Sequence, residues 1–251
     1  MKLSNLLACI AVLICMCSCN FTEEIHVEEN GSGKISLKFD GSQLLQTMNE
    51  MGAPSSEEFE KPIDSIVSFK EVFDEKRDSI SKLPQEEQDK LKKLENFKMH
   101  MIMNQEKQLM KFDLFSDFTS VSDIGNVLND FQNASAMTST QTVNGESKSA
   151  VKSQKPSSEV TYAFSKNTFS RKVKIIDQEL FQKSLEDSKQ TESFLTGSTY
   201  TFKYHFPRKV KSTTAKDATF TVDGKTMVYE VSFLEMMKDP ESISFEVELE
   251  D

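Results

Sequence analysis

The sequence predicts an α+β fold, with antiparallel sheets built from hairpins and several helices packed on one side of them, preceded by a cleaved signal peptide. Three features predict it. Apolar residues alternate with polar ones in several short runs, which is the pattern of strands with one face on a core. Other runs space apolar residues three or four positions apart, as amphipathic helices do. The first nineteen residues form a separate, mostly apolar segment.

The N-terminal segment has the features of an export signal. Lys2 is its only charge, and an apolar run follows from Leu6 to Cys17. A run of this length rises only about 18 Å as a helix, well short of the roughly 30 Å hydrocarbon layer of a bilayer. Residues 1–18 are therefore expected to be a cleaved signal peptide and not a permanent membrane span.

Three cysteines crowd the end of this run, and only Cys19 has a small residue, Ser18, directly before it. The segment resembles the bacterial lipoprotein signal motif, in which a small residue precedes a cysteine that receives a diacylglycerol before cleavage. It departs from that motif at Met16 and Cys17. The resemblance implies cleavage between Ser18 and Cys19 and lipid attachment at Cys19. Cys17 is the alternative acceptor, and an ordinary secretory signal is the alternative interpretation.

Cleavage there leaves one of the four cysteines in the chain, so no intramolecular disulfide can form. Acylation accounts for the leftover cysteine, and several acyl chains make the attachment effectively permanent. With 40 acidic and 30 basic residues, the formal net charge is −10, which argues against nucleic acid and against a polybasic clamp on anionic lipid. The expected location is the cell envelope, with the lipid in the outer membrane and the body facing the periplasm or the surface.

The N-terminal part, residues 19–134, begins with a predicted hairpin. Ile25 and Val27 alternate with polar residues, Asn30-Gly31 favours a type I′ turn, and residues 35–39 resume the alternation. About five residues separate Cys19 from this hairpin, which places it within roughly 20 Å of the bilayer.

Further helices and a second hairpin complete the N-terminal part. Helical spacing, together with Gly and Pro at the ends, predicts helices at 42–51, 64–80, from Pro84 onward, and at 124–131. Alternation predicts strands at 97–103 and 110–114. The methionines of the first of these strands share a face with Phe97, so we expect them to pack in the core and not to bind copper.

Residues 135–158 contain almost nothing apolar, which predicts a flexible polar linker or a long loop. The remaining part, residues 159–251, is strand-rich. Whether it forms one continuous domain with 19–134 stays open, because a long excursion within one sheet would look the same. Its predicted strands are 160–164, 169–175, 200–206, 220–222, 227–233 and 243–249, with helices at 180–185 and 234–238.

The sequence carries no familiar catalytic motif, phosphate loop, dinucleotide turn or zinc pattern. His26, His100 and His205 are each expected alone on the polar side of a strand. His26 and Glu28 share a face, but two ligands do not make a metal site. No catalytic, cofactor-binding or metal-binding residue and no cofactor is therefore predicted, although 40 acidic residues leave room for an unrecognised carboxylate pair.

One basic stretch stands out in an acidic chain, and with His205 it can meet an anionic head group or an acidic partner segment. The simpler interpretation is the wet face of a strand and the loop after it, because exposed charge usually contributes little. The stretch consists of Lys203, Arg208, Lys209, Lys211 and Lys216.

Two stretches resemble uncharacterised lipoproteins of the Bacteroidota: Cys19-Asn-Phe-Thr-Glu-Glu-Ile with the Asn-Gly-Ser-Gly hairpin after it, and Tyr204-His-Phe-Pro-Arg-Lys-Val-Lys with its later Asp-Gly turn. Within the first, Glu23 and Glu24 resemble acidic surface-export signals and would equally serve as a solvated spacer. The Gly-Ser-Gly hairpin is more distantly similar to a mycobacterial lipoprotein domain with an α/β fold. Neither resemblance implies a catalytic residue.

Three hypotheses follow. The first is a non-enzymatic, lipid-anchored envelope protein that binds another envelope component, a protein or a glycan, through an exposed sheet face or groove. The second is an envelope hydrolase, which a cleft with two close carboxylates of split pKa would favour. The third is a lipid carrier, which a closed apolar cavity beneath the sheet would favour and a filled core would exclude.

Overall fold

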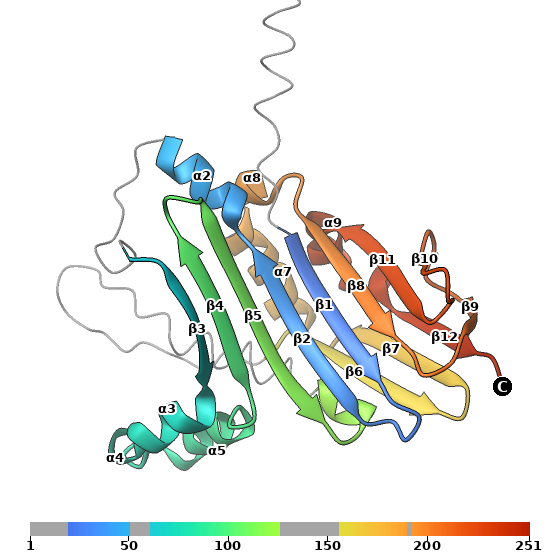
Figure 1. Ribbon diagram of the computed structural model, residues 1–251, viewed down its shortest axis with the longest axis horizontal. Coiled ribbons are helices and arrows are strands. Elements are labelled where there is room, and N and C mark those ends of the chain that lie inside the picture. Colours follow the sequence, from blue (N-terminus) through green and yellow to red (C-terminus); the bar gives the residue numbers. More distant parts are fainter. Residues whose placement is uncertain (1–19, 51–60, 126–155, 190–191) are drawn as a thin grey trace, which may run out of the picture.

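The computed structural model describes residues 20–50, 61–125, 156–189 and 192–251. Within these ranges the chain forms an eight-stranded sheet and a four-stranded sheet with short helices around them (Figure 1). The predicted signal peptide, Ser18 and Cys19 lie outside the described residues, as do residues 135–155 of the predicted linker and most of the helix predicted at 124–131.

The large sheet joins the N-terminal and C-terminal parts of the chain. Its strand order is β10-β11-β8-β1-β2-β5-β4-β3, and neighbouring strands are antiparallel except β1 and β8, which run parallel. The expectation of purely antiparallel pairing is therefore wrong at the centre of the sheet. The strands are β1 (Asn20–Val27), β2 (Gly33–Asp40), β3 (Ile63–Ser68), β4 (Lys98–Asn104), β5 (Leu109–Phe118), β8 (Thr199–His205), β10 (Thr219–Phe220) and β11 (Thr226–Ser232).

The small sheet packs against the inner face of the large one. Its antiparallel strands lie in the order β6 (Ser158–Ser165), β7 (Thr168–Ile175), β12 (Phe245–Leu249) and β9 (Val210–Thr213). Ile25 and Phe202 of the large sheet meet Phe169 and Val247 of the small sheet in one core cluster, and all four are 0% exposed. Alternating apolar positions on both sheets thus close a filled core, as in other sheet-on-sheet packings.

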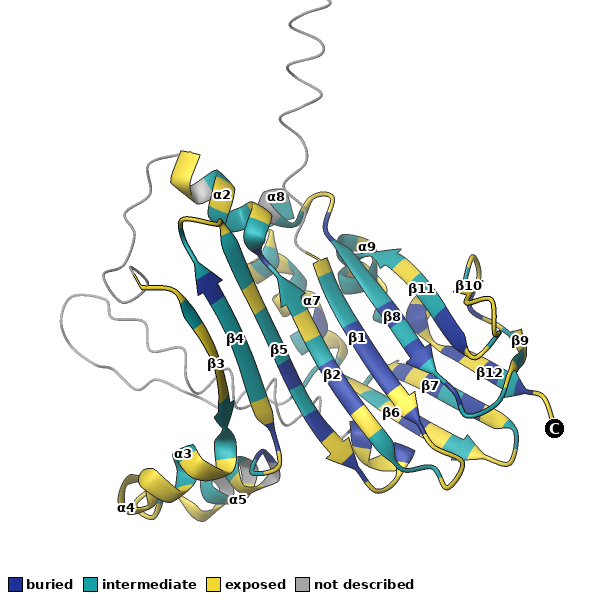
Figure 2. Ribbon diagram, viewed as in Figure 1, coloured by how far each residue is buried: buried dark blue, intermediate teal, exposed yellow. Residues whose placement is uncertain are grey.

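The helices do not form a layer of their own. Helix α7 and the short α9 lie behind the large sheet, on the side of the small sheet, whereas α3, α4 and α5 extend from one end of β3 and β4 and are largely exposed (Figures 1 and 2). The helices are α2 (Ser42–Glu50), α3 (Phe69–Glu75), α4 (Arg77–Ile80), α5 (Gln85–Lys93), α7 (Gln178–Ser188), α8 (Glu192–Leu195) and α9 (Phe233–Lys238), with 3₁₀ turns η2 (Val121–Asp123) and η3 (Pro240–Ile243).

The α+β class is thus confirmed, in a form richer in strands than expected. What lies against the inner face of the large sheet is mainly a second sheet and not a set of packed helices. Among the described helices, none is both long and apolar enough to pass through a membrane.

The predicted hairpins are confirmed, but the first turn differs from the expected type. Gly31 has a φ of 80°, whereas Asn30 keeps a negative φ, and a type I′ turn needs positive φ at both central residues. The chain instead turns over five residues, with the Glu28 N–H donating to the Ser32 carbonyl at 2.8 Å. The Asn30 side chain accepts the Ser32 N–H at 3.0 Å and stabilises the longer loop.

Two short edge strands were not predicted. Ile66, expected on a helix, lies in β3, where pairing with β4 overrides the helical spacing of the apolar residues around it. β9 contains Lys211 and polar neighbours, so its four residues show no apolar alternation, and only its pairing with β12 makes it a strand. Both strands lie at the ends of their sheets, where one edge is unpaired and sequence constraints are weakest.

Candidate functional site

The adjacent glutamates of β1 point to opposite faces of the large sheet. Successive side chains of a strand alternate, so Glu23 faces the small sheet and Glu24 faces outward. Glu23 is 0% exposed and Glu24 is 7% exposed, so neither is part of a solvated spacer. Their opposite directions also keep them from forming the carboxylate pair that a hydrolase would need.

On the inner face, Glu23 is the centre of a buried polar cluster. The hydroxyl of Tyr162 donates to Oε1 at 2.6 Å, the hydroxyl of Tyr200 donates to Oε2 at 2.9 Å, and the hydroxyl of Tyr204 also donates to Oε1. Arg171 Nε lies 3.6 Å from Oε1, and this arginine is only 4% exposed. The carboxylate is therefore both paired and hydrogen-bonded, as a charge removed from water requires.

The surroundings keep the three tyrosines as hydrogen-bond donors. Burial raises the pKa of Tyr162, Tyr200 and Tyr204, and the negative charge of Glu23 raises it further. The guanidinium of Arg171 lies over the ring of Phe202, with Cζ 4.7 Å from its centroid, which adds a cation–π contact. Within the described part of the chain, the buried Nε of Arg171 has no hydrogen-bond partner.

An apolar cavity adjoins this cluster. It has a volume of about 1000 Å³ and lies between the inner face of the large sheet, the small sheet, α7 and α9. This volume is at the upper end of the roughly 300–1,000 Å³ that ligand sites occupy. Its apolar lining includes Phe21, Leu37, Phe39, Leu114, Phe181, Leu185 and Met236, and its polar groups include those of Glu23, Arg171 and Tyr200.

The cavity lies toward the end of the large sheet at which β1 begins. Phe21 and Tyr200 are the second residues of β1 and β8, and they pair in register. β1 begins at Asn20, so the strand follows Cys19 directly, and the expected tether of about five residues is wrong. A lipid on Cys19 would hold this end of the sheet, and the cavity with it, near the bilayer.

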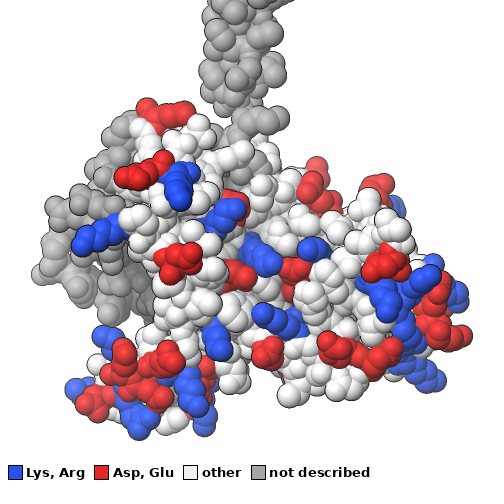
Figure 3. Space-filling view, in the orientation of Figure 1, with Lys and Arg blue, Asp and Glu red and all other residues white. Residues whose placement is uncertain are grey.

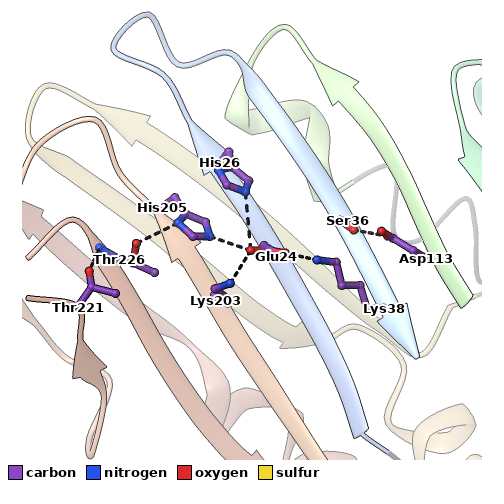
Figure 4. A network of polar contacts seen from close by, with 9 residues as sticks. All are labelled: Glu24, His26, Ser36, Lys38, Asp113, Lys203, His205, Thr221 and Thr226. Carbon is purple, nitrogen blue, oxygen red and sulfur yellow. Dashed lines mark hydrogen bonds and ion pairs between the residues drawn. The ribbon is translucent and has the colours of Figure 1, made fainter. Parts of the chain in front are cut away.

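A second polar cluster lies on the outer face, around Glu24 (Figure 4). His205 Nε2 lies 2.8 Å from Oε1, and Lys203 Nζ lies 2.9 Å from the same oxygen. His26 Nε2 is 3.8 Å from Oε1, and Lys38 pairs with Oε2. The two imidazole rings stack with centroids 3.9 Å apart, because parallel pairing of β1 and β8 sets His26 beside His205.

The cations around Glu24 determine its ionisation. Burial by itself raises the pKa of Glu24, but hydrogen bonds from Lys38, Lys203 and His205 outweigh it and lower the pKa to about 2. In the folded protein, the carboxylate of Glu24 is therefore charged at neutral pH.

Glu24 is expected to make stability depend on acid pH. The pKa of Glu24 is lower in the folded protein than its ordinary value of 4.5. Its contribution to the free energy of unfolding is therefore complete above pH 4.5 and is lost as the pH falls toward about 2. Replacing Glu24 with glutamine should remove this contribution. Urea unfolding of the Glu24→Gln variant and of the wild type, at neutral pH and near pH 2, measures it.

The matched control is Glu28→Gln, at an exposed position in the first turn. Its stability should follow that of the wild type at both pH values. If Glu24→Gln loses no stability at neutral pH, or loses as much at pH 2 as at neutral pH, the ion pairs of Glu24 do not stabilise the fold.

The prediction that each histidine stands alone is wrong. His26 and His205 contact each other and Glu24, and Glu28 is not part of this cluster. His100 pairs with Asp64 of β3, with Nε2 2.8 Å from Oδ1. All three do lie on the polar side of the large sheet. Their meeting depends on the parallel pairing of β1 with β8, which leaves no local signal in the sequence.

The predicted basic stretch is spread over several elements. Lys203 belongs to the Glu24 cluster on the large sheet, whereas Lys211 lies on β9 and pairs with Glu248 at 2.7 Å. In the view of Figure 3, basic and acidic side chains are interspersed over the surface of the molecule. Arg208 donates to Asn167 Oδ1 at 2.9 Å and lies 3.3 Å from Glu29, and the stem of Lys209 lies beside Gly224.

No protein-family model and no curated protein matches the sequence. Among solved structures, the folded domain of the LppM protein of Mycobacterium tuberculosis is similar with a TM-score of 0.39 and 7% identity, over 93% of this chain and 91% of that domain. The expected similarity to a mycobacterial lipoprotein domain is thus found as a distant structural one, while the resemblance to Bacteroidota lipoproteins gains no support. A TM-score this low supports no inference about function.

Proposed function

We propose that this chain is a non-enzymatic, lipid-anchored protein of the bacterial cell envelope that binds the acyl chain of a lipid in the cavity behind the large sheet. The observation that carries the proposal is the cavity itself, because it is large, mainly apolar and placed beside an otherwise filled core. The cavity is partly open, unlike the closed one expected of a lipid carrier, but its apolar lining beneath the sheet supports that hypothesis over the hydrolase.

The lining matches a flexible hydrocarbon. Leu37 and Leu114 of the sheet face Phe181 and Leu185 of α7, and each buried methylene of a ligand contributes about 0.8 kcal/mol. Met236 adds a side chain that adapts to chains of different shape.

The cavity also offers a place for one polar group. Glu23, Arg171 and Tyr200 lie in its wall, and the other described lining residues are mostly apolar. A lipid has the same arrangement of one polar and one apolar part, with a hydroxyl, ester or acid group at one end of a long apolar chain. The same end of the sheet follows Cys19, so an acyl chain would reach the cavity over a short distance from the bilayer.

Photocrosslinking in intact cells tests the proposal. Cells are fed a fatty acid with a photoreactive diazirine, irradiated, and the full chain is purified and digested. Peptides of α7 and η3 should then carry the added mass of one lipid. Leu185→Trp puts a bulkier ring into the wall of the cavity beside α7 and should reduce this labelling. Leu180→Trp, on the same helix but not in the lining, should label as the wild type does.

Two results would contradict the proposal. Labelling of α7 that is equal in both tryptophan variants would mean that the probe reacts at the surface. A crosslink joining α7 to the N-terminal peptide, and absent from Cys19→Ser, would mean that the cavity holds the protein's own anchor and not a separate lipid.

A further inference from the structure

Three side chains of the outer face bring metal-ligating atoms close together. Glu24 and His26 come from β1 and His205 comes from β8, and one ligand atom of each lies within 4.8 Å of the other two. The rings of His26 and His205 stack nearly parallel, so His26, whose side chain is 49% exposed, has to turn out of the stack for both imidazoles to aim at one ion. In Figure 4 both imidazoles point toward the carboxylate of Glu24. This cluster is on the opposite face of the sheet from the cavity, so it takes no part in the proposed lipid binding.

We propose that Glu24, His26 and His205 form a binding site for Zn²⁺. Two imidazoles and one carboxylate are a donor set that zinc uses, and three protein ligands leave a fourth position for water or for a group of a partner. Tetrahedral zinc with bonds of 2.0–2.2 Å holds neighbouring ligand atoms about 3.3 Å apart. The observed separations from Glu24 Oε1, 2.8 Å to His205 Nε2 and 3.8 Å to His26 Nε2, bracket that value.

The contacts of His205 fit a metal ligand. Its Nδ1 lies 2.9 Å from the hydroxyl of Thr226, while Nε2 faces Glu24. A carboxylate only accepts hydrogen bonds, so Nε2 donates to Glu24 when no metal is bound. A Zn²⁺ ion on Nε2 would take the place of that hydrogen, and Nδ1–H would then donate to the hydroxyl of Thr226, which can rotate to accept the bond. Such a partner fixes the orientation of a ligating imidazole.

Lys38 and Lys203 neutralise Glu24 in the absence of metal. Both are partly accessible, with side chains 44% and 42% exposed, so each can turn into solvent when an ion takes its place. The positive charges of the two lysines weaken the attraction of Glu24 for any divalent cation. The two imidazoles therefore decide which cation binds. The site should therefore take Zn²⁺, which binds nitrogen well, and exclude Mg²⁺, which prefers oxygen ligands.

Calorimetric titration of the full-length protein in detergent with ZnCl₂ tests the site. One Zn²⁺ should bind per chain, MgCl₂ should give no binding, and His26→Ala and His205→Ala should each lose the zinc binding. His100→Ala is the matched control and should bind as the wild type does, because His100 pairs with Asp64 in another part of the sheet. Thr226→Val should bind about 10-fold more weakly.

NMR of the wild-type imidazoles provides a test that does not depend on how the variants fold. Zinc should shift the signals of His26 and His205 and leave those of His100 in place. The proposal is overturned if zinc shifts none of these signals, if it shifts those of His100 alone, or if folded His26→Ala, checked by circular dichroism, binds zinc with unchanged affinity.

Discussion

Arg171→Met is expected to lower the free energy of unfolding by about 3–5 kcal/mol, the largest effect of any single substitution considered for this chain. Arg171 is the cation nearest to Glu23, and both side chains are enclosed between the two sheets. Methionine fills much of the same volume but leaves the buried Glu23 without its cation. Urea unfolding at neutral pH, followed by circular dichroism, measures the loss.

Two companion variants separate the charge effect from a packing effect. In Glu23→Gln with Arg171→Met, no charge stays buried, so part of the lost stability should return. Arg77→Met removes an arginine whose side chain is 78% exposed, and it should change stability by no more than about 0.5 kcal/mol. If the double variant is as unstable as Arg171→Met alone, the destabilisation comes from packing and not from the unpaired glutamate.

Cys19→Ser is expected to move the protein from the membrane fraction to the soluble fraction. Serine cannot form the thioether that holds the diacylglycerol, so the several acyl chains that would make the attachment effectively permanent are lost. Fractionation of cells, together with the mass of the N-terminal peptide, measures both the location and the modification. The wild-type peptide should begin at Cys19 and carry the mass of its acyl groups.

Cys17→Ser is the control for this experiment, because Cys17 is the alternative acceptor. It should leave anchoring and processing unchanged. Membrane association that survives Cys19→Ser but not Cys17→Ser would move the attachment site by two residues. Association that survives both changes would mean that the protein is not anchored by a lipid on either cysteine.

Local alternation predicted most strands and the face that each presents to the core. The alternation of Phe21, Glu23 and Ile25 also indicates a buried charge, because it places a glutamate at an inward position. Arg171 interrupts the apolar positions Phe169 and Val173 in the same way. A charged side chain at an inward position needs a partner of opposite charge. Glu23 and Arg171, both at inward positions, therefore predict that their two strands face each other in the core.

The partners themselves could not be identified from such patterns. Tyr162, Tyr200 and Tyr204 follow Glu23 by 139, 177 and 181 positions, and their sequence surroundings are those of ordinary core tyrosines. The order of strands decides which residues meet, and periodicity carries no information on strand order. The cavity was equally hidden, since its lining residues follow the same apolar pattern as the filled core beside it.

The central position of β1 in the large sheet has a consequence for the order in which the chain can fold. β1 emerges first, yet one of its two hydrogen-bonding edges is satisfied only by β8, whose residues begin at Thr199. Until β8 pairs with β1, that edge offers unpaired amides and carbonyls to any extended chain nearby, which invites aggregation. Contacts of such long sequence separation also form slowly. Completion of the central part of the large sheet therefore has to wait until the last third of the chain is available.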